Sequence, residues 1–155
     1  MSHLIMVSLF APDLTQHPPR SPRVRLGGYA MLPRSLDKVR AKLAGKVGEY
    51  LFPNPMDKWL LEFAGIDADA FAEAVKTGKS DSEMLAWIKE NSTTKRTDWE
   101  IAAWSQWLEN LAPGNARRHG MTGEWITKNA PSREDIHTLV ERLDLDDYVA
   151  FGGKP

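Results

Sequence analysis

Residues 20–50, RSPRVRLGGYAMLPRSLDKVRAKLAGKVGEY, decide the fold. They join a basic segment and a Gly-Gly pair to one amphipathic helix. The apolar residues of that helix recur at steps of three and four, which places them on one face: Tyr29, Leu32, Leu36, Val39 and Leu43. Pro33 is tolerated only in the first turn, so we expect the helix to begin near residues 30–32. Gly45 is placed to end it.

The polar residues of this helix predict its exposed side. Asp37 and Lys38 lie opposite the apolar stripe, so we expect them at the surface. Arg40 lies nearer the edge of the stripe, where its stem can be buried while its head reaches a carboxylate. We expect Glu49 to be that partner, in a structural ion pair.

Short helices with clear start and stop signals follow Tyr50. The start signals are N-caps and capping boxes at Asn54-Pro55, Asp67, Ser80 with Glu83, and Thr97 with Glu100, and Ser132 is expected to begin the last helix. Residues 115–130 have no sustained period and are expected to be a surface connection. Residues 4–10 and 147–151 carry only weak strand patterns.

The pattern as a whole predicts an all-α fold. We expect a single compact domain over residues 1–155, with about six short helices in an irregular or orthogonal bundle. Residues 1–25 are interpreted as an extended arm rich in proline and arginine, and residues 26–151 as the helical core. A length of 155 residues is typical of one domain.

Composition narrows the classes of function. The chain has no cysteine, which excludes disulfides, thiolate metal sites and cysteine nucleophiles. The first ten residues do not resemble a signal peptide, and no apolar run has the length of a membrane span, so we expect a soluble cytoplasmic protein without membrane partners. Residues 1–50 hold 8 Lys and Arg against 3 Asp and Glu, whereas residues 51–155 hold 12 against 18. The excess of positive charge in residues 1–50 is too small to predict nucleic-acid binding.

Several motifs in the same order resemble a bacterial family, the domain of unknown function 5069. They are PPRSPR at 18–23, LGGY at 26–29, LDKVRAKLAG at 36–45, GEY at 48–50, FAGIDADAF at 63–71, LAWI at 85–88 and ERLDLDD at 141–147. The resemblance covers most of the chain and implies a compact cytoplasmic domain. It implies no substrate, cofactor or catalytic residue.

Two groups of residues are candidates for a site. The first is a ligand site for a small anion, in which the backbone of the glycine pair and nearby arginines bind: Arg20, Arg23, Arg25, Gly27, Gly28, Tyr29 and Arg40. The alternative role of the glycines is a tight turn onto the helix. The second group is Glu49 with Tyr50, a candidate pair for acid–base catalysis. The four histidines lack the spacing of a metal pair, so neither a metal nor a cofactor is expected.

Three functions are compatible with the sequence. The first is a noncatalytic binding domain for a small anionic ligand or a protein partner, near residues 20–29 and 49–50. The second is a small enzyme in which Glu49, Tyr50 and an arginine share acid–base work. The third is a homo-oligomeric interaction protein that pairs through the apolar residues 1–10 or exposed tryptophans. Trp99, Trp104 and Trp107, on one expected helix, either line an aromatic pocket or fill the core.

Overall fold

The computed structural model describes residues 11–114 and 116–155. Within them it contains seven helices and a pair of two-residue strands, which confirms the helical fold class. The elements are β1 (Arg25–Leu26), β2 (Tyr29–Ala30), α2 (Leu32–Leu43), α3 (Pro55–Ala64), α4 (Ala68–Lys76), α5 (Asp81–Asn91), α6 (Asp98–Asn110), α7 (Ala116–Asn129) and α8 (Leu139–Ala150). The weak strand pattern at residues 4–10 and the apolar residues 1–10 lie outside the described residues.

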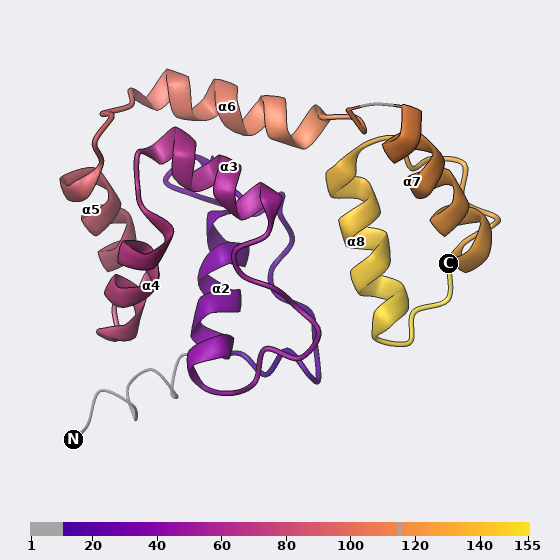
Figure 1. The fold of residues 1–155 in the computed structure, drawn as a ribbon, viewed down its shortest axis with the longest axis horizontal. Coiled ribbons are helices and arrows are strands. Elements are labelled where there is room, and N and C mark those ends of the chain that lie inside the picture. Colours follow the sequence, from indigo (N-terminus) through magenta and orange to yellow (C-terminus); the bar gives the residue numbers. More distant parts are fainter. Residues whose placement is uncertain (1–10, 115) are drawn as a thin grey trace.

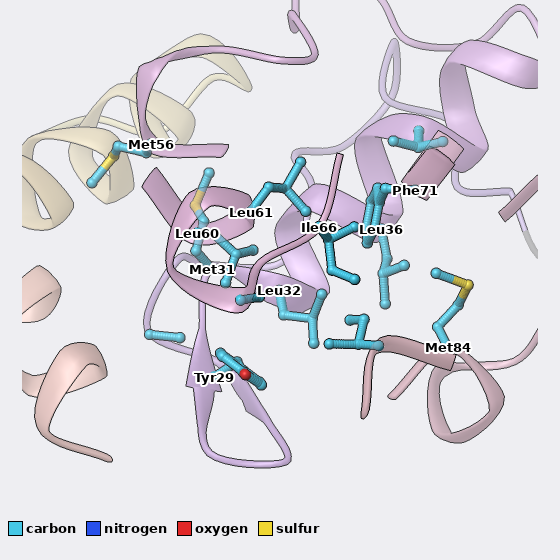
Figure 2. Close-up of a cluster of buried hydrophobic side chains, with 14 of the residues drawn as sticks. Tyr29, Met31, Leu32, Leu36, Met56, Leu60, Leu61, Ile66, Phe71 and Met84 are labelled. Carbon is cyan, nitrogen blue, oxygen red and sulfur yellow. The ribbon is translucent and has the colours of Figure 1, made fainter. Parts of the chain in front are cut away.

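Helix α2 stands at the centre of the arrangement (Figure 1). Helices α4 and α5 flank it on one side, α8 with α7 lie on the other, and α6 runs across one end and contacts both β2 and α8. The apolar stripe of α2 packs into the main core, where Leu32 and Leu36 meet Leu60, Phe71 and Met84 among others (Figure 2). None of the described helices combines the length and apolarity that a bilayer crossing requires.

The glycine pair forms the turn of the small hairpin that precedes α2. Arg25 pairs with Ala30 and Leu26 with Tyr29, so Gly27 and Gly28 are the two loop residues. Their φ angles are 57° and 84°, which match the turn type that favours glycine at both positions. The Ser105 hydroxyl of α6 donates to the Gly28 carbonyl at 2.6 Å and accepts from the Ala30 N–H at 2.8 Å. The hairpin is thereby fixed to α6.

The surface position expected for Asp37 and Lys38 is wrong. Every residue from 32 to 41 is buried, and Lys38 is only 1% exposed. Because other segments surround α2 on all sides, its polar face is covered as well, and each charge on that face meets a partner. Arg40 likewise pairs with Asp81, at 2.7 Å, and not with Glu49 as expected.

In the described part of the chain, four helices begin at a capping box, in which a side chain accepts from the backbone N–H three residues later: Asn54, Ser80, Thr97 and Thr138. The boxes at Ser80 and Thr97 were expected, and Asn54 was expected as an N-cap. The last helix begins at Leu139, after the Thr138 cap, and the expected start at Ser132 is wrong. Residues 147–150 belong to α8, so the weak strand pattern there is wrong as well.

The expected surface connection at residues 115–130 is instead mostly helix α7. Two glycines, Gly120 and Gly123, and an irregular apolar pattern concealed this helix in the sequence. It accounts for the difference between about six expected helices and the seven that the described residues contain.

Candidate binding groove beside helix α8

The described residues enclose a groove of about 600 Å³ between the segment 48–54, helix α2 and helix α8. Its apolar lining comes from Leu14, Leu51, Leu143, Ala150 and Phe151. Its polar lining includes Arg34, Glu49, Tyr50, Asp146 and Asp147. The groove thus joins a segment early in the chain to its last helix.

Arg34 and Asp147 form the polar base of the groove. Arg34 Nη1 and Nη2 lie 2.7 and 3.3 Å from the two carboxylate oxygens of Asp147, and the Arg34 side chain is 3% exposed. Its Nε is also buried and has no hydrogen-bond partner among the described residues. Such a planar, two-pronged contact fixes both side chains in orientation. It also ties α8 to the centre of the fold.

Tyr50 completes this base. Its hydroxyl donates to Asp147 Oδ1 at 2.7 Å, and the Arg34 guanidinium lies 5.5 Å from the centre of its ring. Burial, helped by the hydrogen bond to Asp147, raises the pKa of Tyr50 well above its ordinary value. Tyr50 therefore keeps its proton at neutral pH and acts as a hydrogen-bond donor.

The groove carries more negative than positive charge. Among the described residues that line the groove, Arg34 is the one cation, and it is already matched by Asp147. Asp146 and Glu49 add two further carboxylates to the lining. Burial raises the pKa of Asp146 above its ordinary value, because the charged form loses hydration. A cation bound beside Asp146 would replace that lost hydration.

The arginines expected to bind an anion are each matched by a carboxylate. Arg20 contacts Asp37 at 3.0 Å and Asp81 at 2.8 Å. Arg23 contacts Asp144 at 3.2 Å, and Arg25 contacts Glu109 at 2.9 Å. Arg20 and Arg40 meet at Asp81 on α5, whereas Arg23 contacts α8 and Arg25 contacts α6, so the four arginines do not converge on one place.

Of the other expected site residues, Tyr29 is buried against Phe63, and the glycine pair forms the hairpin turn. Of all the residues expected to form a site, only Glu49 and Tyr50 line the groove. Sequence reasoning missed Arg34, Asp146 and Asp147. A signal for Asp147 was present, because it lies two helical turns after the buried Val140, and a carboxylate on an apolar stripe requires a buried partner.

No group of three or more side chains suited to a metal ion occurs in the part of the chain that the structure describes. No curated protein is similar to the chain. The model of one family, described as a domain of unknown function (DUF5069), matches residues 16–149. This match covers most of the chain and confirms the resemblance of its motifs, so the chain belongs to the DUF5069 family.

Proposed function

We propose that this protein is a noncatalytic binding domain whose site is the groove beside α8. Its ligand would be a small molecule with a protonated amine at one end and an apolar body. The observation that carries the proposal is the excess of negative charge in the groove. The charges of Arg34 and Asp147 balance each other, and the carboxylates of Glu49 and Asp146 come in addition to that pair. The apolar wall formed by Leu51, Leu143 and Phe151 would receive the rest of the ligand.

The charges of the groove and of the hairpin favour an amine ligand over the small anion that the sequence predicts. An anion in the groove would meet two carboxylates beyond the matched pair, and like charges at close range disfavour binding. An anion near the hairpin would have to displace Asp37, Asp81, Asp144 or Glu109 from the arginines that they contact. An ammonium group beside Asp146 gains a charge-assisted hydrogen bond instead.

A binding role is also better supported than acid–base catalysis. The pKa of Tyr50 is raised and its hydroxyl is held by Asp147, so it is a poor base at neutral pH. Glu49 stays a candidate contact to the ligand amine. We also propose a cytoplasmic location, which the complete lack of cysteine is compatible with.

Three small molecules of matched size test the charge preference: phenethylamine, phenethyl alcohol and phenylacetate. We expect only the amine to raise the melting temperature in a thermal-shift assay. A ligand at a hundred times its Kd adds about 2.7 kcal/mol of stability. For a chain of this size, each kcal/mol corresponds to about 2–4 °C.

The site variant is Asp146→Asn, and its matched control is Glu90→Gln on the exposed side of α5. Both remove one negative charge, but only Asp146 lines the groove. We expect the amine-induced shift to be lost in Asp146→Asn and kept in Glu90→Gln. Equal shifts with all three molecules, or the same loss in both variants, would contradict the proposal.

A further inference from the structure

A second cavity, of about 280 Å³, lies between α3 and α6 and is lined mainly by aromatic rings. Trp59 and Phe63 are one turn apart on α3, and Trp104 and Trp107 are one turn apart on α6, so each pair faces the same side of its helix. Glu62 and Arg96 complete the lining. We call these six residues the aromatic cleft. Among the described residues, none lines both this cleft and the groove beside α8.

The rings of the aromatic cleft form a continuous chain of contacts. Phe63 and Trp104 are stacked with their centres 5.2 Å apart. Trp104 lies 6.2 Å from Trp107, and Trp107 lies 6.1 Å from Trp59. Trp107 is nevertheless 47% exposed, so a large indole surface remains open to solvent at this point. Of the tryptophans on α6, only Trp99 lies outside the cleft, at 72% exposure.

One end of the cleft already holds a cation. The Arg96 guanidinium lies 4.2 Å from the centre of the Phe63 ring, and its Nε donates to the Phe63 carbonyl at 3.0 Å. Its charge is matched by Glu100, which Nη1 contacts at 3.3 Å. The negative faces of aromatic rings attract cations in this way, most strongly those of tryptophan.

Glu62 supplies the remaining charge of the cleft. Within residues 11–114 and 116–155 it forms no ion pair. Because Arg96 is matched by Glu100, the three indoles and the Glu62 carboxylate together give the open end a negative character. That end therefore favours a second cation, and it disfavours an anion.

We propose that Trp59, Trp104 and Trp107, with Glu62, bind a quaternary or methylated ammonium group. Methyl groups spread the positive charge over a rounded surface that can contact several rings at once. They also weaken hydration, so less is lost when the group leaves water. A primary amine or guanidinium has directional hydrogen bonds that the indole faces cannot satisfy.

The test uses choline and its neutral carbon isostere 3,3-dimethyl-1-butanol (dimethylbutanol below). Each is titrated into the protein at constant ionic strength, and tryptophan fluorescence is measured. We expect choline to change the fluorescence saturably and dimethylbutanol to bind at least about tenfold more weakly, which corresponds to about 1.4 kcal/mol for the charge. Equal binding of the two would mean an apolar cleft only, and would overturn the proposal. Absence of any saturable change with choline would overturn it too.

Trp107→Leu and Trp99→Leu form a matched pair on one helix, since both remove an exposed indole but only Trp107 lines the cleft. We expect choline to bind at least about fivefold more weakly to Trp107→Leu and unchanged to Trp99→Leu. Glu62→Gln, a change at an exposed position, is a second site variant in case Trp107→Leu disturbs folding, and it should also weaken binding. Choline affinity unchanged in Glu62→Gln and in a folded Trp107→Leu protein would refute the assignment.

Discussion

Replacing Asp57 with asparagine should destabilise the protein by more than any surface change, because it isolates a buried cation. Lys38 is 1% exposed, and its Nζ lies 2.5 Å from Asp57 Oδ2. Asp57, fully buried, also accepts from the Ser35 hydroxyl at 2.5 Å and from the Asn54 N–H at 2.9 Å. Asparagine keeps the shape and an acceptor oxygen but removes the charge that Lys38 requires.

Breaking a buried ion pair on one side costs about 3–5 kcal/mol. A natural domain has a total free energy of unfolding of about 5–15 kcal/mol, so Asp57→Asn removes a large part of it. Lys38→Met leaves the opposite charge buried and should cost a similar amount. The double variant leaves neither charge of this pair buried without its partner, and we expect it to be at least about 2 kcal/mol more stable than either single variant.

Urea denaturation of the four proteins measures these differences through the midpoint at unchanged slope. Exposed Glu73→Gln on α4 is the control and should change stability by less than about 0.5 kcal/mol. If the double variant lost the sum of the two single losses, the two side chains would be independent and the reasoning would be refuted.

A pH series adds an independent check. Burial lowers the pKa of Lys38, and the Asp57 charge opposes that effect, so the pKa falls further in Asp57→Asn. Between this lower pKa and the unfolded value of 10.5, the folded protein binds fewer protons than the unfolded chain. The stability of Asp57→Asn should therefore rise from neutral to alkaline pH. A decrease over that range would contradict the assignment.

Three further predictions concern single positions. Asp146→Asn should stabilise the unliganded protein at neutral pH, because the raised pKa of Asp146 means that its charged form lowers the free energy of unfolding. In urea denaturation at a series of pH values, this gain should disappear as the pH falls towards 3.8. Gly27→Ala should lower the free energy of unfolding by about 1–3 kcal/mol, since φ is 57° and the added Cβ would lie 2.5 Å from Leu85 carbons. Gly45→Ala is the control and should cost less in the same assay, because its Cβ would meet nothing within 4 Å. Ser105→Ala should cost about 1–3 kcal/mol because it leaves buried backbone groups of the hairpin without partners, with calorimetry as the measurement.

Helix existence was predictable where local chemistry decides it. The capping boxes at Ser80 and Thr97 and the apolar stripe of Leu32, Leu36 and Val39 gave correct helices, since their signals lie within one or two turns of sequence. Helix α7 was missed because its two glycines and mixed pattern give no local signal.

The site was harder to predict because its contacts are long-range. Glu49 and Tyr50 do line the groove, but the residue that orients Tyr50 is 97 positions further along the chain. The burial of Lys38 likewise depends on Asp57, on another helix. No periodicity within α2 distinguishes a charge that meets solvent from one that meets a buried partner.

The contact between Arg34 and Asp147 has a consequence for how the protein is made. Its two residues are 113 positions apart, so Arg34 at the start of α2 cannot meet Asp147 until α8 has been synthesised. Until then α2 carries a guanidinium without its carboxylate partner, and burying that charge unpaired would cost free energy. During synthesis from the N-terminus, α2 is therefore made early, whereas Asp147, the carboxylate that pairs with Arg34, is made much later. We expect a chain that ends before α8 to lose the partner of both Arg34 and Tyr50 and to be less stable for that reason.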